Sequence, residues 1–276
     1  MSYTIGAMIP CKKDTDLLFK FQQAKELGLT SCQISIWDPS FFQNDEFLIY
    51  VKDALQKADF TISALWAGWS GPCEWNFHTG PDVVGLVPPA YRFQRLKELM
   101  TASDFAEKLG ISKIITHVGF LPETPSDPNF IGTVGALRSL AKYMRAKGQY
   151  FLFETGQETP TTLLRTIESI GCDNLGINLD TGNLILYGKG NPLDALDVFG
   201  KYVMETHIKD GFYPTDGMHL GQEAPAGAGK ANISAVIRRL QEIGYDGAFT
   251  IEREISGEKQ IEDILTAKRI IEESLA

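Results

Sequence analysis

Short hydrophobic runs rich in β-branched residues recur along the chain, and several of them follow an amphipathic stretch that ends in glycine. An apolar residue and then a glycine close four such stretches, at Gly28, Gly110, Gly171 and Gly244. Glycine at this point can adopt the left-handed conformation that ends a helix, and the chain then enters an extended run. Each of the four glycines is therefore predicted to mark a junction between a helix and a strand.

The whole pattern predicts eight strands that alternate with eight helices. The strands are expected near residues 3–8, 31–36, 60–66, 111–117, 150–154, 175–180, 202–208 and 247–252. The helices are expected near residues 14–27, 43–57, 91–109, 132–147, 160–170, 192–199, 232–243 and 259–274. Alternating strands and helices are typical of a parallel sheet, and eight such units in about 250 residues have the usual size of a closed barrel. The predicted fold is therefore α/β, a single (β/α)8 TIM barrel domain that spans residues 1–276.

An open, doubly wound sheet is the alternative arrangement of alternating strands and helices. It would be favoured by a Gly-x-Gly-x-x-Gly motif directly after the first strand, where the backbone approaches a dinucleotide. This chain reads IGAMIPCKKD at that place, so the motif is absent. Neither a low-complexity tract nor a block of like charge divides the chain into further domains.

Charge and composition narrow the classes of partner. The net charge is −9, so the summed field repels nucleic-acid phosphates and anionic lipid surfaces. No run of 18 or more apolar residues appears, and the chain does not begin with a basic segment followed by a long apolar stretch. The four cysteines form no Cys-x-x-Cys pair, which in a reducing compartment indicates packing residues. We therefore expect a cytoplasmic protein that binds neither nucleic acid nor membranes.

Four polar side chains stand at the ends of the last four predicted strands: Glu154, Asp180, His207 and Glu252. Glu154 and Asp180 are 26 positions apart, and Asp180 and His207 are 27 apart, which is about one strand and one helix each. The larger gap before Glu252 contains a Gly/Pro-rich insertion at 210–231. One such residue alone would be interpreted as solvent-facing or as a helix cap. In a barrel, however, the carboxyl ends of all strands meet at the edge that carries the chemistry.

Together these four residues predict a metal site. Three carboxylates in a small space repel one another unless a cation neutralises them or protons bind. Three oxygen ligands and one imidazole favour Mn²⁺, Mg²⁺ or Co²⁺, and Zn²⁺ also accepts such a set. The expected cofactor is therefore a divalent metal ion, with Mn²⁺ as the preferred candidate.

The same segments resemble a known family. The motifs FETG, NLDTGNLILYGKGNPLDAL, ETHIKD and TIERE, in this order, are similar to those of the xylose-isomerase-like barrel superfamily. That superfamily contains sugar-phosphate isomerases and epimerases, ketose 3-epimerases and inosose dehydratase. The resemblance covers the whole chain and is strongest from Phe151 to Glu254. It implies a metal held by the four residues named above, with Glu154 and Glu252 also acting as the acid–base pair.

The implied chemistry is proton transfer at a carbon beside a carbonyl, with the cation stabilising an enediolate. Glu154 and Glu252 would remove and return the proton on opposite faces of the substrate, since strands five and eight are far enough apart to flank it. The predicted function is a metal-dependent isomerase or epimerase of a sugar or sugar phosphate. The alternative is a lyase or dehydratase of a keto-inositol or keto-glycoside, and a barrel that only binds its ligand is a third class.

Five residues are candidates for substrate contacts: His117, Lys209, Asn183, Trp66 and Trp37. His117 ends the fourth predicted strand, and the two tryptophans offer aromatic faces on which a sugar could stack. Ketose 3-epimerases usually carry a histidine at the place of Asn183, and an arginine shortly after the metal histidine, where this chain has Lys209. The ammonium group of Lys209 could bind a substrate oxygen.

Alternative interpretations stay open for Lys209 and for two loops. Lys209 could instead pair with Asp210 or Glu205. The aromatic loop at 64–92 either faces the substrate or packs its own small core as a lid or interface, and we expect a homo-oligomer that uses it. The segment GAGKAN, 227–232, could cradle a phosphate before a helix capped by Asn232, but a plain turn is the favoured interpretation.

Overall fold

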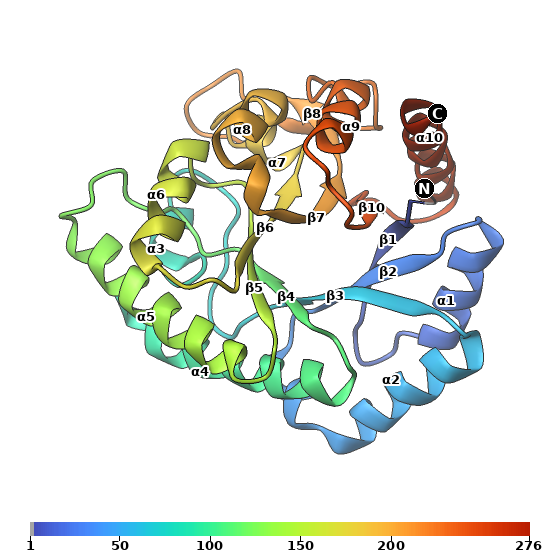
Figure 1. The fold of residues 1–276 in the computed structure, drawn as a ribbon, viewed down its shortest axis with the longest axis horizontal. Helices are drawn as coiled ribbons and strands as arrows, with labels where there is room; N and C mark the ends of the chain where they lie inside the picture. Colours follow the sequence, from blue (N-terminus) through green and yellow to red (C-terminus); the bar gives the residue numbers. More distant parts are fainter. Residues whose placement is uncertain (1–2) are drawn as a thin grey trace.

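Eight short strands form a closed parallel barrel in the computed structural model, which describes residues 3–276 (Figure 1). The barrel strands are β1 (Ile5–Pro10), β2 (Ser31–Ile36), β3 (Thr61–Ala67), β4 (Lys113–Thr116), β5 (Tyr150–Glu154), β6 (Leu175–Asp180), β7 (Val203–Ile208) and β10 (Phe249–Ile251). Each strand pairs with its neighbours in this order, and β10 closes the barrel against β1. The predicted single (β/α)8 TIM barrel is therefore confirmed.

Helices cover the outside of the barrel, as Figure 1 shows. The eight that alternate with the barrel strands in residues 3–276 are α1 (Leu17–Glu26), α2 (Asp45–Ala58), α4 (Pro89–Lys108), α5 (Pro128–Arg145), α6 (Pro160–Ile170), α8 (Pro192–Phe199), α9 (Ile233–Glu242) and α10 (Glu258–Leu275). Helices α4 and α5 begin a few residues before their predicted starts. Proline fits the first turn of a helix, where its missing N–H is not needed, so each helix starts at its proline. Within the described part of the chain, no helix is both long enough and apolar enough to cross a membrane.

Short elements that the hydrophobic pattern does not predict lie in the connecting loops. They are η1 (Pro39–Gln43), α3 (Gly80–Val83), α7 (Asn183–Leu186), η2 (Gly200–Tyr202) and the hairpin of β8 (Asp210–Phe212) with β9 (Gln222–Ala224). The four junction glycines have φ angles between +67° and +81°, in the left-handed region. The predicted helix-to-strand junctions are therefore confirmed at the level of the backbone.

The register of the strands brings the predicted polar residues to one edge of the barrel. Asp180 at the end of β6 is aligned with His207 on β7. Glu154 ends β5 and is aligned with Asn178 on β6. Glu252 directly follows β10, which lies on the other side of β7. Four consecutive strands of the barrel thus deliver one candidate ligand each to the same place.

Candidate metal centre

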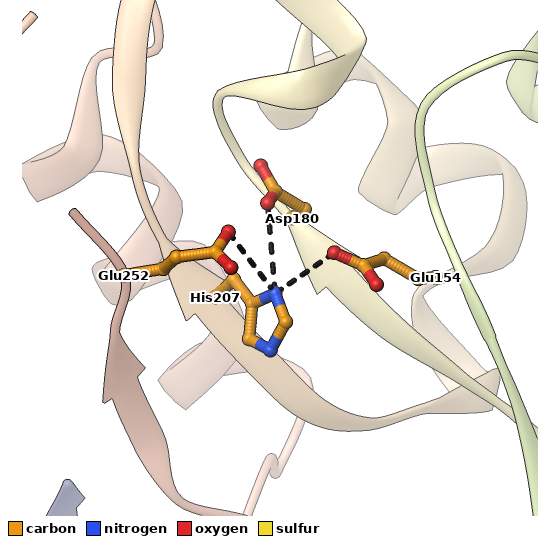
Figure 2. A group of neighbouring side chains, drawn as sticks. All are labelled: Glu154, Asp180, His207 and Glu252. Atoms are coloured by element: carbon orange, nitrogen blue, oxygen red, sulfur yellow. Dashed lines mark hydrogen bonds and ion pairs between the residues drawn. The ribbon is translucent and has the colours of Figure 1, made fainter. Parts of the chain in front are cut away.

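Glu154, Asp180, His207 and Glu252 converge on a common point at the carboxyl edge of the barrel (Figure 2). One ligand atom from each lies within 4.8 Å of all the others. Nδ1 of His207 lies 3.0 Å from Oε1 of Glu154, 3.6 Å from Oδ2 of Asp180 and 3.5 Å from Oε2 of Glu252. Such separations suit ligands that each lie about 2.1 Å from a shared ion. The structure therefore brings together all four residues that the sequence predicted as ligands.

The electrostatics of this cluster fit a cation. Oδ1 of Asp180 accepts hydrogen bonds from the backbone N–H groups of Gly182 and Asn183, but its buried Oδ2 has no hydrogen-bond partner within residues 3–276. Burial raises the pKa of Asp180 to about 7. Burial lowers the pKa of His207, but the charges of Glu252 and Glu154 outweigh this and hold it well above its ordinary value. Without a cation, Asp180 and His207 retain protons that offset part of the negative charge of the cluster. The four side chains together therefore favour a bound positive ion.

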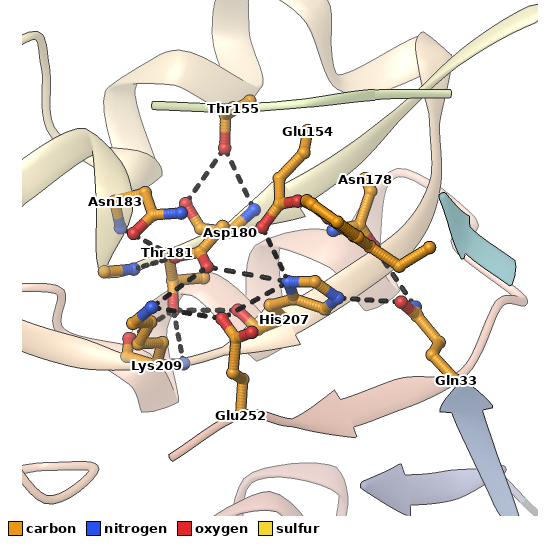
Figure 3. Close-up of polar contacts among 12 residues, drawn as sticks. Gln33, Glu154, Thr155, Asn178, Asp180, Thr181, Asn183, His207, Lys209 and Glu252 are labelled. Atoms are coloured by element: carbon orange, nitrogen blue, oxygen red, sulfur yellow. Dashed lines mark hydrogen bonds and ion pairs between the residues drawn. The ribbon is translucent and has the colours of Figure 1, made fainter. Parts of the chain in front are cut away.

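Gln33 on β2 orients the candidate histidine ligand from inside the barrel (Figure 3). Its Oε1 lies 2.7 Å from Nε2 of His207, and its own Nε2 donates to Oδ1 of Asn178 and to Oε2 of Glu205. Because the Gln33 amide group donates on one side, its oxygen is left to accept the Nε2–H of His207. The Nδ1 lone pair then faces the three carboxylates, as a metal ligand requires.

Gln33→Leu is expected to lower the affinity for the metal ion about 10- to 100-fold, because nothing would then hold the imidazole in the ligating tautomer. A chelator-competition titration with Mn²⁺ measures the change. Ser31→Ala on the same strand is the matched control, since the buried Ser31 hydroxyl has no hydrogen-bond partner in the described chain. Equal affinities for the two variants would show that Gln33 does not position His207.

A pocket of about 340 Å³ opens beside the four candidate ligands. Its lining consists of Met8, Ser35, Trp37, Trp66, Trp75, His117, Glu154, Asn183, Leu186, Tyr187, Leu220, Glu252 and Glu254. Four of the five predicted substrate-contact residues are in this lining, and the fifth, Lys209, is not. The short helix α7 carries Asn183, while His117 lies one residue beyond the end of β4.

The walls of the pocket hold Glu154 in place. Trp66 donates its indole N–H to Oε2 of Glu154, and Nε2 of His117 lies 3.5 Å from the same oxygen. The ring centroids of Trp37 and Trp66 are 4.7 Å apart, and those of Trp75 and His117 are 5.1 Å apart. Trp66 is buried, whereas Trp37 and Trp75 are each 38% exposed. The aromatic loop thus packs a small core and also supplies faces to the pocket, and its role in a homo-oligomer stays a prediction.

Lys209 lies beside the cluster with its side chain buried between carboxylates. Its Nζ is 3.1 Å from Oε2 of Glu252 and 3.1 Å from Oε1 of Glu254. The pairing of Lys209 with Asp210 or Glu205 that the sequence allowed is therefore wrong. Glu205 pairs with Lys113 at 2.7 Å, and the carboxylate of Asp210 accepts hydrogen bonds from the backbone of the turn at 227–232. Burial lowers the pKa of Lys209, but Glu252 and the other carboxylates around it hold that pKa well above its ordinary value.

The segment at 227–232 does not form an open cradle for phosphate. Backbone N–H groups of Gly227, Gly229 and Ala231 donate to the carboxylate of Asp210 at 2.9–3.0 Å. The chain's own anion fills the place that a phosphate would take. The expected cap is also absent, since Asn232 has a left-handed backbone and makes no side-chain capping hydrogen bond.

Asp210→Asn should lower the free energy of unfolding by about 2 kcal/mol or more, since the amide keeps one acceptor and turns an NH2 group toward backbone donors. Denaturant unfolding measures this change. Asp216→Asn is the control, because Asp216 accepts comparable backbone hydrogen bonds in an exposed loop. If both variants lost the same small amount, the buried turn around Asp210 would not depend on its charge.

A (β/α)8 barrel with three carboxylates and one histidine at its carboxyl edge defines a class of protein with a candidate divalent-metal centre. A family model described as xylose isomerase-like TIM barrel matches residues 21–275, and the chain belongs to this family. It is similar to a xylose isomerase domain protein from Planctomyces limnophilus, with 32% identity, a TM-score of 0.90, and coverage of 99% of this chain and 97% of that chain. It is 28% identical over 209 residues to an uncharacterized protein of Methanocaldococcus jannaschii, a match that spans 68% of this chain and 66% of the relative.

Three more distant structures share the fold. One, from Mycobacterium smegmatis, is a complex with magnesium and is 19% identical, with a TM-score of 0.74 over 100% of this chain and 98% of that chain. D-psicose 3-epimerase in the presence of D-fructose is 14% identical, with a TM-score of 0.67 over 98% of this chain and 97% of that chain. A probable 3-DHS dehydratase from Bacillus anthracis is 16% identical, with a TM-score of 0.68 over 97% of this chain and 99% of that chain. At these identities the likeness shows the fold alone.

Proposed function

We propose that this protein is a divalent-metal-dependent isomerase or epimerase of a keto-sugar, with Glu154 and Glu252 as the acid–base pair. One observation carries the proposal. These two glutamates belong to the candidate metal cluster, line the pocket, and lie on either side of His207 in Figure 2. A substrate in the pocket would therefore have one carboxylate on each side. Among the fold neighbours, one structure is a complex with magnesium and another is a ketose epimerase, so the same fold is compatible with both parts of the proposal.

The protein environment keeps both glutamates ionised and so able to accept a proton. Burial raises the pKa of Glu154, but the charges of His117 and His207 outweigh it and lower that pKa. Burial also raises the pKa of Glu252, and Lys209 and His207 together hold it well below the ordinary value. When bound, a divalent cation supplies Lewis-acid stabilisation of the negative charge that develops on substrate oxygens. One ionised glutamate takes the proton from the carbon beside the carbonyl, and the other, after it has taken up a proton from solvent, donates that proton on the opposite face.

Elimination is the second candidate function, because it shares the same first proton transfer. A lyase or dehydratase must also place a polar group near the departing hydroxyl. His117 is such a third group, since it lines the pocket and its Nε2 lies 3.5 Å from Glu154. A dehydratase is also among the fold neighbours. The keto-inositol or keto-glycoside lyase is therefore retained as the alternative.

Solvent exchange tests the proposal and separates its alternatives. The Mn²⁺-loaded protein is incubated in D₂O with ketoses, ketose phosphates, keto-inositols and keto-glycosides, and NMR reads the deuterium at each carbon. Deuterium at one carbon of substrate or product supports the isomerase or epimerase, whereas loss of water, or of the aglycone from a keto-glycoside, supports the lyase. A protein that binds Mn²⁺ but exchanges no proton on any of these compounds would be a binding protein, and the proposal would be wrong.

A further inference from the structure

The charged side chains that line the pocket determine which substrates can enter it, which the candidate reaction alone does not specify. Three carboxylates, those of Glu154, Glu252 and Glu254, line the pocket. Within residues 3–276, no lysine or arginine is part of that lining. Lys209, the cation held against these carboxylates, is buried, and its ammonium group is engaged by Glu252 and Glu254. An anionic substrate would therefore meet no uncommitted positive side chain in the pocket.

A bound divalent ion does not reverse this balance. Four carboxylates, those of Glu154, Asp180, Glu252 and Glu254, outweigh one divalent cation and the ammonium of Lys209 by one negative charge. The remaining polar groups in the lining, on Ser35, His117, Asn183 and Tyr187, include no permanent cation. Like charges at short range in a partly enclosed pocket are mutually costly. A phosphate ester would therefore be repelled by the same side chains that hold the metal.

The backbone gives no compensating anion site at the nearby glycine turn. The N–H groups of Gly227, Gly229 and Ala231 all donate to Asp210, whose carboxylate is buried in the turn. A Cβ built on Gly229 would lie 2.2 Å from Oδ1 of Asp210, so the turn is closed around that carboxylate. The arrangement that usually binds phosphate at a helix N-terminus is thus satisfied within the chain.

What the pocket does offer suits an uncharged sugar. Trp37 and Trp75 are partly exposed aromatic side chains in its wall, and the C–H faces of sugars stack on such rings. Hydroxyl and amide groups of Ser35 and Asn183 can exchange hydrogen bonds with sugar hydroxyls without requiring a charge.

We infer that the pocket accepts an uncharged keto-sugar and excludes phosphorylated or carboxylated ones, and that Glu254 enforces the exclusion. The inference rests on the proposed function, since it names the substrate class of the same site. Glu254 is not a candidate metal ligand, and its side chain is 63% exposed at the pocket rim, 3.1 Å from Lys209. It is therefore a charge that a substrate meets on entry.

The experiment compares a ketose with its own terminal phosphate ester in the deuterium-exchange assay. The wild-type protein should prefer the ketose in kcat/KM by about tenfold or more, because like charges across a binding surface are strongly unfavourable. In Glu254→Gln this ratio should fall severalfold, chiefly through a lower KM for the ester, because one repelling charge is lost and Lys209 loses a partner. The wild-type ratio should also shrink at high salt, since Glu254 is exposed to screening ions. Glu258→Gln, which removes another exposed charge at the start of α10, should leave the ratio unchanged.

The outcomes separate this inference from the proposed function. If the ester is processed as well as or better than the ketose, the inference is overturned while the isomerase proposal stands. If neither compound exchanges, the proposed function fails, and the inference is then tested by a binding measurement alone. Quenching of tryptophan fluorescence by the two compounds, read on the Mn²⁺-loaded protein, then tests it, because Trp37 and Trp75 line the pocket. Tighter binding of the ester than of the ketose overturns the inference, and the reverse order supports it.

Discussion

Replacing Glu252 by glutamine should lower the rate of deuterium exchange by about 10²- to 10⁴-fold, which is the usual contribution of a positioned acid or base. Glutamine retains a carbonyl oxygen that can ligate a cation but cannot accept a proton from carbon. Glu252 both lines the pocket and contributes an atom to the metal cluster. The substitution therefore removes its role as a base and largely spares its role as a ligand. Glu154→Gln should have an effect of the same order, for the same reason.

Asp180→Asn is the matched control for this prediction, because it makes the same chemical change in the same cluster. Asp180 contributes an atom to the metal cluster, but it is fully buried and does not line the pocket, so we expect it to ligate the metal ion and not to take a substrate proton. Asp180→Asn should weaken metal binding, and saturating Mn²⁺ should restore much of its exchange rate. Glu252→Gln should stay inactive at the same saturation, with metal content checked in both. Recovery of Glu252→Gln by metal alone would show that Glu252 is a ligand and not a base.

The fold and the four candidate ligands could be predicted from sequence because both depend on local signals. The glycines at Gly28, Gly110, Gly171 and Gly244 mark where helices end, and strands follow within a few residues. In a parallel barrel the carboxyl end of every strand lies at the same edge. Knowing where each strand ends was therefore enough to place four residues together without any knowledge of side-chain contacts.

The partners of those residues depend on closure of the barrel and could not be predicted in the same way. Gln33 contacts His207 across 174 positions of sequence, and its local signal is only the alternation of SCQISI, in which Gln33 is one of three polar residues at every second position. Lys209 lies next to Asp210 in sequence, yet pairs with Glu252 and Glu254 because β7 and β10 are neighbours in the barrel. Several charged groups could reach this lysine in principle, and only the three-dimensional packing selects among them.

The turn at 227–232 shows a different limit of prediction from sequence. Its glycines and following helix have the composition of a phosphate site, and sequence cannot say which anion occupies the amide groups. Asp210 fills them from the adjacent hairpin strand β8. The plain turn that the sequence favoured is thus correct, and the structure adds the reason for it.

Removal of the metal ion should destabilise the protein, and the loss should grow as pH rises from about 4 toward 8. Folded Asp180 has a pKa of about 7, raised chiefly by burial, against an unfolded value of about 3.9. Between these values the folded chelated protein binds a proton that the unfolded chain has released, so stability falls as pH rises. The raised pKa of His207 acts in the same direction, because its stabilising charge is complete below the unfolded value and is lost as pH rises through the folded one.

Glu154 and Glu252 set the lower limit of the pH range in which the chelated protein is stable. Their pKa values are lowered in the folded protein, so the stability they contribute is present above about 4.3, the ordinary value for glutamate, and is lost at lower pH. A divalent cation takes over the role of the protons on Asp180 and His207. Its affinity therefore increases with pH, since these ligands must be deprotonated to bind it.

The measurement is the thermal midpoint with saturating Mn²⁺ and with chelator, at several pH values between 5 and 8. A free ion at a thousand times its Kd stabilises the folded state by about 4 kcal/mol, which corresponds to on the order of ten degrees for a domain of this size. The gap between the two midpoints should widen with pH. In Asp180→Asn the chelated protein should depend less on pH, because the buried carboxylate that titrates near neutrality is gone. A gap that narrows as pH rises, or no gap at any pH, would mean that the cluster does not hold a cation.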